Sequence, residues 1–342
     1  MPFFFRWLLA ALVILGNYGH FSAQPETQGL VNWMSFKEAQ EKNKQVEKPF
    51  IIDIYTDWCG WCKHMMRTTY SNPGIADYIN RNFYPVKFDA EGKDTLEYDG
   101  KIYKPTSPNP RTPHELAIKF LGNGLSYPST VFVTNKFQYT LLSQGYMDEK
   151  KFEPLLVFMV ENAWRSATYD QFNAHFQHSF YDTAFPKGKL KKYKVEELES
   201  LVKKKSKKAL VLINAGFCNT GKVMSLTTFN DTSLVKYLDK HFYFSELEVT
   251  RSDSVMFKHE KYGQVLVNNF PMNSLALKLS NNQLTLPTLC ILDEQLNTIQ
   301  VLNFYQAPEN LYPVLRYFGT DAYKKQAYPE FIQAEQQKGK KP

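Results

Sequence analysis

Short apolar runs alternate with amphipathic stretches along this chain. The run 50–55 is almost continuously apolar, which is typical of a strand buried on both faces of a sheet. Residues 63–82 read as helical, with an interruption at Asn72-Pro73-Gly74, because proline disfavours continuation of a helix. Further expected elements are a strand at 83–89, an inserted hairpin or loop at 92–113, a helix at 114–121, a buried strand at 130–134, an edge strand at 138–144 and a closing helix at 148–166. This alternation predicts an α/β unit in which helices flank a central mixed sheet.

The same pattern occurs a second time, 159 positions further along the chain. The apolar run 50–55 falls on another apolar run, 209–214, in this register. Residue pairs at the same offset include Cys59 and Cys218, Pro128 and Pro287, Thr68 and Thr227, Thr69 and Thr228, Tyr70 and Phe229, and Phe172 and Phe331. Chance matches do not hold one register over so long a stretch, so we predict two tandem domains of the same fold.

The chain length of 342 residues suits two domains of ordinary size. We expect a signal peptide at 1–23, a first domain at 24–177, a linker at 178–194 and a second domain at 195–342. The apolar run 7–15 follows Arg6 and is too short to cross a bilayer, which takes about 20 residues. It fits a secretory signal, with an uncleaved membrane anchor as the alternative. Export to the periplasm or the cell exterior would let disulfides persist.

The net charge of +7 is mild for this length. Its basic residues concentrate in two runs, 187–194 and 203–208. Such runs can contact nucleic acid or an anionic membrane, but a solvated linker and a solvated helix end explain them more simply. We therefore expect no nucleic-acid partner.

The candidate chemistry lies in Cys59-Gly60-Trp61-Cys62, directly after the strand at 50–55. At the start of a helix, unpaired backbone N–H groups and the helix dipole favour the thiolate of Cys59, which is the nucleophile. Cys62 lies one turn further on, within reach of a mixed disulfide formed at Cys59. Trp61 offers a flat apolar surface beside the sulfurs for a partner. The spacing therefore predicts a redox-active pair.

Other readings of this pair remain open. A structural zinc site needs four ligands, and the nearest additional candidate is His64, with no second CxxC motif to complete the set. A purely structural disulfide is the better alternative, although so short a loop stabilises the fold little. We expect neither a metal nor another cofactor.

The segment 53–63, Asp-Ile-Tyr-Thr-Asp-Trp-Cys-Gly-Trp-Cys-Lys, resembles the active-site segment of thioredoxins. It is most similar to the thioredoxin-like domains of bacterial envelope proteins, including the C-terminal domain of the transmembrane disulfide-bond reductase. The resemblance covers about residues 33 to 160 and reaches the second unit through the repeat. It implies two tandem thioredoxin-like domains, each with a central mixed sheet flanked by helices.

The resemblance also implies roles for individual residues. Asp53 matches the buried acid that helps to move the proton of the second cysteine; a local pairing with lysine is the alternative. Tyr127 and Pro128 match the cis-proline segment whose backbone pairs with the substrate, and Trp58 and Trp61 are expected to bind substrate as well. Trp61 replaces the proline of cytoplasmic thioredoxin, so the resemblance does not fix the redox potential.

The second unit lacks most of these residues. In the repeat register, Leu212 replaces Asp53, Phe217 replaces Trp58, Cys218 matches Cys59, Gly221 replaces Cys62, and Pro287 matches Pro128. Without the second cysteine the dithiol cycle cannot run there. We expect a non-catalytic unit with a degenerate site at Cys218 and Pro287, and the alternatives are that Cys218 acts alone or pairs with Cys290.

Taken together, these features predict a thiol–disulfide oxidoreductase that acts on protein thiols and disulfides in the periplasm or outside the cell. The resemblance to a reductase domain favours reduction or isomerisation over oxidation. A membrane-bound electron donor is one candidate partner. The competing hypothesis is a non-catalytic binding or chaperone module of an envelope complex, in which two thioredoxin-like domains serve as a scaffold.

Overall fold

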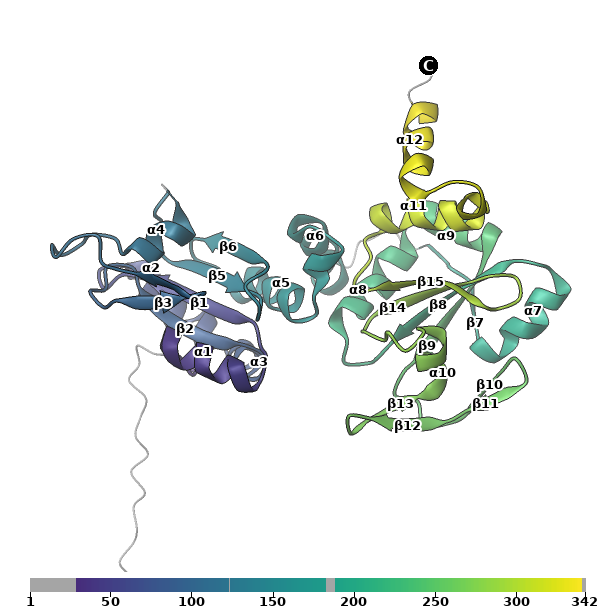
Figure 1. The fold of residues 1–342 in the computed structure, drawn as a ribbon, viewed down its shortest axis with the longest axis horizontal. Coiled ribbons are helices and arrows are strands. Elements are labelled where there is room, and N and C mark those ends of the chain that lie inside the picture. Colours follow the sequence, from purple (N-terminus) through teal and green to yellow (C-terminus); the bar gives the residue numbers. More distant parts are fainter. Residues whose placement is uncertain (1–28, 123, 183–187, 340–342) are drawn as a thin grey trace, which may run out of the picture.

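The computed structural model describes residues 29–122, 124–182 and 188–339. Figure 1 shows two lobes side by side, each with a twisted sheet between helices. The first lobe contains α1 (Phe36–Gln45), β1 (Phe50–Tyr55), α2 (Gly60–Arg67), α3 (Pro73–Asn82), β2 (Tyr84–Asp89), β3 (Leu96–Tyr98), β4 (Lys101–Tyr103), α4 (Glu115–Leu121), β5 (Ser129–Val133), β6 (Thr140–Gln144), α5 (Glu149–Val160) and α6 (Tyr169–Phe180). The predicted fold class, two thioredoxin-like α/β domains in tandem, is confirmed.

The second lobe repeats this order with additional strands. It contains β7 (Lys192–Tyr193), α7 (Leu198–Lys204), β8 (Lys208–Asn214), α8 (Asn219–Leu226), α9 (Thr232–His241), β9 (Phe242–Glu248), β10 (Val255–Phe257), β11 (Glu260–Tyr262), β12 (Gln264–Val267), β13 (Phe270–Asn273), α10 (Ser274–Leu279), β14 (Thr288–Leu292), β15 (Thr298–Asn303), α11 (Pro308–Gly319) and α12 (Tyr328–Gly339). The hairpins β10–β11 and β12–β13 stand where the first lobe has the single hairpin β3–β4.

Both sheets place an apolar strand near their centre. The first sheet has the order β2-β1-β5-β6, with β1 parallel to β2 and antiparallel to β5. The second has the order β15-β14-β8-β9-β7, with the same arrangement around β8. The continuous burial of β1 and β8 follows from helices on both faces of each sheet, as expected from their unbroken apolar runs. A redox motif that follows such a strand is therefore held on a rigid support.

The interruption expected at 72–74 is confirmed, whereas the closing helix ends earlier than expected. Pro73 begins α3 rather than only ending the helix before it, because the Oδ1 atom of Asn72 accepts hydrogen bonds from the N–H groups of Gly74 (2.9 Å) and Ile75 (3.1 Å). The closing helix expected at 148–166 ends at Val160, since Asn162 has a left-handed backbone with φ of 56°.

The predicted segment boundaries remain predictions. The expected linker, 178–194, contains the end of α6 and the short strand β7, which pairs in parallel with β9. The expected signal peptide, 1–23, lies outside the described residues. Across the described ranges, no helix combines the length and apolar character needed to span a bilayer.

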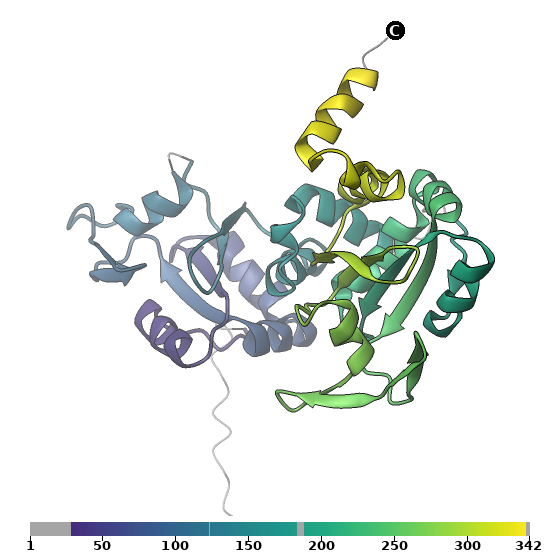
Figure 2. The same ribbon diagram turned by 45° about the vertical axis from the view of Figure 1, so that its right-hand side comes forward.

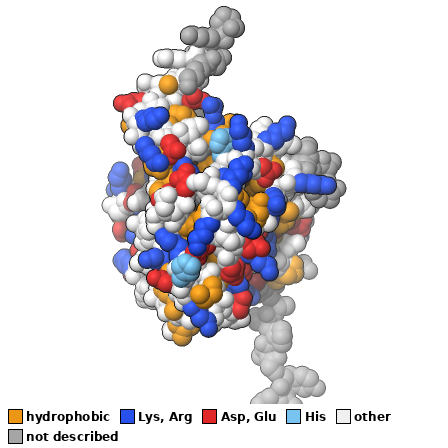
Figure 3. All heavy atoms as spheres, turned by 90° about the vertical axis from the view of Figure 1, so that its right-hand side faces the viewer, with side chains coloured by type: hydrophobic (Ala, Val, Ile, Leu, Met, Phe, Trp, Pro, Cys, Tyr) orange, Lys and Arg blue, Asp and Glu red, His pale blue; other side chains and the backbone are white. Residues whose placement is uncertain are grey.

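One expectation about the basic runs is wrong. Lys208, at the end of the run 203–208, is buried in β8, where its Nζ atom contacts carboxylates of Glu294 (2.6 Å) and Asp321 (2.9 Å). The other lysines are nearer the surface, and Lys203 pairs with Glu199 at 2.8 Å. Figure 3 shows basic and acidic side chains interspersed over this end of the second lobe. The run 203–208 is thus solvated only in part, because its last lysine forms buried ion pairs.

The two lobes pack against each other through the C-terminal helices of the first. Figure 2 shows α5 and α6 between the two sheets. One buried apolar cluster continues from the first lobe into the second, and the ring of Phe172 on α6 meets that of Tyr305 edge-on at 5.1 Å. The interface is therefore a continuous apolar core rather than a surface contact.

Candidate functional site

The start of α2 holds the cysteine pair. Cys59 is the N-cap of this helix, and its Sγ atom accepts a hydrogen bond from the N–H of Cys62 at 3.1 Å. The two sulfurs are joined in a disulfide with an S–S distance of 2.06 Å. Cys62 follows one turn further along, inside the helix. The structure thus brings the two predicted sulfurs together at a helix start, where a thiolate at Cys59 would be stabilised after reduction.

The pair is less exposed than the sequence suggests. Cys59 and Cys62 are each only 5% exposed. Their neighbours Trp58 and Trp61 are 56% and 62% exposed, which is unusual for large apolar side chains. A partner sulfur must therefore approach Cys59 past an apolar rim.

Aromatic side chains form this rim on two sides of the disulfide. The ring of Trp58 meets Tyr127 edge-on at 6.0 Å, and its Nε1–H donates to the carboxylate of Glu91 at 3.1 Å. Trp61 contacts His64 and Tyr146, each at 5.5 Å between ring centroids. Such contacts hold the indoles in place without burying them.

Asp53 lies on β1, the strand that precedes the pair, and is almost fully buried. Its Oδ1 atom accepts a hydrogen bond from the Tyr70 hydroxyl at 3.4 Å, and that hydroxyl is also 3.3 Å from the Oγ1 atom of Thr130. Burial raises the pKa of Asp53 to about 7, although the charge of Lys87 on β2 and the bond from Tyr70 favour the carboxylate. At neutral pH this carboxyl group can therefore both accept and release a proton.

A cleft of about 740 Å³ opens beside Asp53 and Cys62. Its walls include Lys87, Trp33 and Asp57. The Oδ2 atom of Asp53 is buried and has no hydrogen-bond partner within the described residues. Water in this cleft would give the carboxyl group a route for proton exchange with solvent.

The Tyr127–Pro128 peptide bond is cis, and so is the Leu286–Pro287 bond at the corresponding place in the second unit. Both conformations agree with the resemblance that implies them. Pro128 directly precedes β5, which pairs with β1, while Tyr127 lies against Trp58. The substrate-binding role of this segment remains a prediction.

The site in the second unit that corresponds to the cysteine pair is buried. Cys218 is the N-cap of α8 and is free, as is Cys290 on β14, and both are buried. They are not joined to each other, so the structure contains no Cys218–Cys290 disulfide. Burial, together with the charge of Glu161, raises the pKa of the Cys218 thiol to about 12. A thiol in this state is a poor nucleophile near neutral pH.

The side chain of Asn214 occupies the place of the second cysteine. A Cβ atom built at Gly221 would lie 1.9 Å from the Oδ1 atom of Asn214, because the asparagine side chain fills this space. Leu212, in the place of Asp53, is fully buried in apolar surroundings. Both replacements predicted from the repeat are therefore accompanied by repacking around them.

Several residues that shape the two sites are absent from the sequence-based candidates. Tyr70 and Thr130 complete the buried polar group around Asp53, and Glu161 closes the site at Cys218. The repeat register contains a signal for the first two, because Phe229 and Leu289 stand at their places without a hydroxyl group. No comparable signal marks Glu161.

Comparison with known proteins finds a family model that matches the first unit and two relatives that match part of the chain. Residues 22–178 match the family model Thioredox_DsbH, described as a protein of unknown function, DUF255. The uncharacterized protein B0495.5 of Caenorhabditis elegans is 26% identical over 105 residues, which make up 30% of this chain and 12% of that protein. An uncharacterized protein of Archaeoglobus fulgidus is 27% identical over 70 residues, 20% of this chain and 55% of that protein. The chain thus matches less than two thirds of either relative.

Solved structures resemble parts of the chain. A thioredoxin-fold protein from Helicobacter pylori has 17% identity and a TM-score of 0.31, covering 46% of this chain and 92% of that one. A structure called DsbH oxidoreductase has 19% identity and a TM-score of 0.24, covering 36% and 80%. The C-terminal domain of DsbD from Neisseria meningitidis, in the oxidised form, has 20% identity and a TM-score of 0.25, covering 34% and 84%. Likeness at this level supports no conclusion about activity; the family match and the Cys59–Cys62 disulfide support thiol–disulfide chemistry in general.

Proposed function

Since residues 22–178 of this chain belong to the thioredoxin-like superfamily, we propose that the protein is a thiol–disulfide oxidoreductase acting on protein disulfides through Cys59 and Cys62. We propose reduction or isomerisation rather than oxidation as its reaction. One observation carries the proposal: Cys62 of the disulfide at the start of α2 lines the same cleft as a buried carboxyl group, Asp53, whose pKa is about 7. A structural disulfide has no need for a titratable group in a cleft beside it.

The first step is attack on the substrate. In the reduced protein the Cys59 thiolate attacks one sulfur of a substrate disulfide. A mixed disulfide forms between Cys59 and that sulfur, and the second substrate sulfur leaves as a thiolate that takes a proton from water. The N–H groups at the start of α2 stabilise the attacking thiolate.

The second step releases the product. Asp53 takes the proton of the Cys62 thiol, and the resulting thiolate attacks the Sγ atom of Cys59. The Cys59–Cys62 disulfide forms, the substrate sulfur leaves as a thiolate, and Asp53 returns its proton to water through the cleft. Two electrons have passed from the dithiol to the substrate.

The aromatic rim is proposed to receive the substrate chain. Trp58 and Trp61 offer exposed apolar surface beside Cys59, and Tyr127 with Pro128 lies next to Trp58. Aromatic surface of this kind binds polypeptide with little loss of side-chain freedom. We propose no metal or organic cofactor.

The proposed compartment is the periplasm or the cell exterior, because the apolar run 7–15 after Arg6 fits a secretory signal. Repeated turnover as a reductase needs electrons from outside the chain. A membrane-bound dithiol donor is the candidate we propose.

The test is reduction of a model protein disulfide by the purified full-length chain. Cys59→Ser should reduce the rate to that of the reaction without protein, while Cys218→Ser should leave it unchanged. Cys62→Ser should accumulate a mixed disulfide through Cys59, visible as a mass increase under non-reducing conditions. Equal rates for the wild-type chain and Cys59→Ser would disprove the proposal.

The 5% exposure of Cys59 favours a second candidate, a non-catalytic binding or chaperone module. On this reading, the rim of Trp58 and Trp61 binds polypeptide while the disulfide only supports the loop. This module would suppress aggregation of an unfolded protein equally well as wild type and as Cys59→Ser. The oxidoreductase proposal instead requires the disulfide to be reducible in the folded chain.

A further inference from the structure

The carboxylate of Glu161, from the end of α5 in the first unit, is bound at the start of α8 in the second. Its Oε1 atom accepts the N–H of Asn219 at 3.0 Å. Its Oε2 atom accepts the N–H of Thr220 at 2.7 Å and the Thr220 hydroxyl at 2.6 Å. The Sγ atom of Cys218 lies 3.5 Å from the same oxygen. We call Cys218, Asn219 and Thr220 the α8 docking site.

This docking site is the second unit's counterpart of the redox site. In the repeat register its three residues correspond to Cys59, Gly60 and Trp61. In the first unit Trp61 is 62% exposed, whereas Thr220 is fully buried. The face that carries the disulfide is therefore open in the first unit. In the second unit the matching face is covered by the end of α5, which belongs to the first unit.

Helix geometry explains why a carboxylate fits there. The first N–H groups of a helix have no partner within it, and the helix dipole favours a negative charge at this end. Cys218 gives α8 no side-chain cap, so Glu161 supplies the acceptors that a capping residue would provide. Hydrogen bonds to a charged acceptor are roughly twice as strong as neutral ones.

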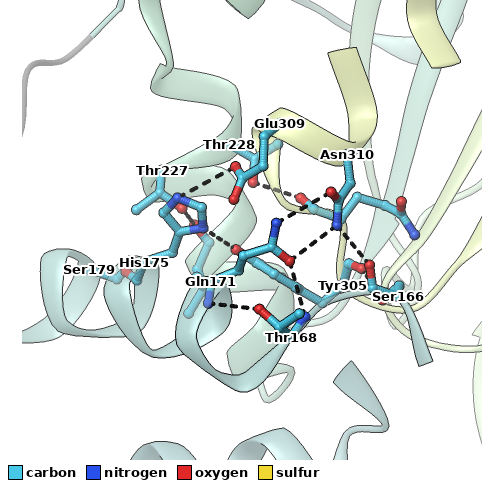
Figure 4. Close-up of polar contacts among 12 residues, drawn as sticks. Ser166, Thr168, Gln171, His175, Ser179, Thr227, Thr228, Tyr305, Glu309 and Asn310 are labelled. Carbon is cyan, nitrogen blue, oxygen red and sulfur yellow. Dashed lines mark hydrogen bonds and ion pairs between the residues drawn. The ribbon is translucent and has the colours of Figure 1, made fainter. Parts of the chain in front are cut away.

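A second set of polar contacts links the two units (Figure 4). The Nδ1 atom of His175 on α6 lies 2.5 Å from the Tyr305 hydroxyl oxygen. The Nδ2–H of Asn310 donates to the carbonyl of Ser166 at 3.0 Å. Tyr305 corresponds to Tyr146, which is beside Trp61 in the first unit, so the contact of His175 with Tyr305 also lies near the counterpart of the redox site.

We propose that the redox site of the second unit has become an intramolecular docking site, in which Glu161 adds a polar contact to the apolar interface and shields the Cys218 thiol. Loss of the Glu161 carboxylate weakens the contact and exposes Cys218 without unfolding either unit. This inference concerns the second unit and does not rest on the proposed exchange reaction.

The experiment uses the full-length chain with the Cys59–Cys62 disulfide intact, so that Cys218 and Cys290 are its only free thiols. Alkylation by iodoacetamide under native conditions is followed at each cysteine by mass spectrometry. Glu161→Gln and Glu161→Ala should raise the alkylation rate of Cys218 by about tenfold or more. Cys290, inside β14, is the internal reference and should not change.

Asp170→Asn is the matched control, because Asp170 is an exposed acid on α6 that also loses its charge in this variant. It should leave Cys218 as slow as in the wild-type chain. If the Glu161 variants match this control, or if Cys218 and Cys290 become reactive together, the proposal is wrong.

Hydrogen exchange gives a readout that does not depend on thiol chemistry. The Asn219 and Thr220 amides should exchange faster in Glu161→Gln and stay protected in Asp170→Asn. Should the Glu161 variants fail to fold, Thr220→Val decides, since it keeps both backbone N–H groups and removes only the hydroxyl donor. We expect a severalfold rise in Cys218 alkylation with Thr220→Val, and no rise would overturn the proposal.

Discussion

The two units differ most in the layer beneath the helix that follows the central strand. In the first unit three polar side chains, Asp53, Tyr70 and Thr130, are buried and hydrogen-bonded together. In the second unit their counterparts are Leu212, Phe229 and Leu289, all buried and apolar. Burying a carboxyl or hydroxyl group without a hydrogen-bond partner lowers the stability of the fold. The hydroxyl groups would therefore lose their partner if the acid alone were replaced. The comparison shows that the acid and its two hydroxyl partners occur together in the first unit and are all replaced by apolar residues in the second.

The largest effect is expected from placing the acid in the second unit. Leu212→Asp puts a carboxyl group into an apolar site that lacks the hydroxyl of Tyr70, and should lower the free energy of unfolding by roughly 3–5 kcal/mol. Chemical denaturation measures the change. The double variant Leu212→Asp/Phe229→Tyr should regain part of the loss, and a double variant no more stable than the single one would contradict the comparison.

Removing the acid Asp53 from the first unit should raise the free energy of unfolding, the opposite of the effect of Leu212→Asp. The pKa of Asp53 is about 7 in the folded chain, against an ordinary value of 3.8. Between these values the folded chain keeps a proton that the unfolded chain has released, so the contribution of Asp53 to stability falls as the pH rises. Above about pH 7 the charged carboxylate costs on the order of 4 kcal/mol.

Asp53→Asn should therefore be more stable than the wild-type chain at about pH 8 and similar to it at about pH 3. It should also slow release of the mixed disulfide, because Cys62 loses its proton acceptor. Denaturation curves at both pH values measure the stability difference. A difference that does not change with pH would show that Asp53 does not titrate as described.

A smaller effect is expected at the place of the missing cysteine. Gly221→Cys forces the Asn214 side chain to move, since the new Cβ atom would lie 1.9 Å from its Oδ1 atom. Such overpacking costs about 1–3 kcal/mol. Asn214→Ala in the same chain should relieve most of it, whereas an unchanged stability of Gly221→Cys would mean that this space is open.

The smallest change in stability is expected for a matched pair of exposed aromatic residues. Trp58 and its counterpart Phe217 are 56% and 59% exposed, so replacing either with alanine should alter stability by only about 0.5 kcal/mol. Trp58→Ala should slow reduction of a protein disulfide by up to about tenfold, while Phe217→Ala should not. Equal rates for the two variants would show that Trp58 does not contribute to substrate binding.

Much of this comparison could be predicted from the sequence. The strand at 50–55, the position of Cys59 at a helix start and the repeat offset of 159 all follow from local patterns, and the structure agrees with them. These features depend on residues close together in the chain or on a simple register. They place the disulfide correctly but say little about its surroundings.

What could not be predicted depends on contacts between distant segments. Tyr70 is 17 positions from Asp53; the repeat register marks it through Phe229, but only the fold shows that its hydroxyl meets the carboxyl group. Glu161 is further removed still, because it acts between the units, whereas the repeat relates only positions within each unit. The low exposure of Cys59 likewise results from packing around the loop, which the motif does not encode.

The most direct test compares the two N-cap cysteines in one reduced full-length chain. Alkylation rates of Cys59 and Cys218 are measured across the pH range by mass spectrometry, which reports each thiolate separately. We predict that Cys59 titrates below the free-thiol value of about 8.5, while Cys218 stays unreactive until the pH is well above that value. A Cys59 midpoint at or above about 8.5, or a Cys218 midpoint below that of Cys59, would contradict the assignment of redox chemistry to the first unit alone.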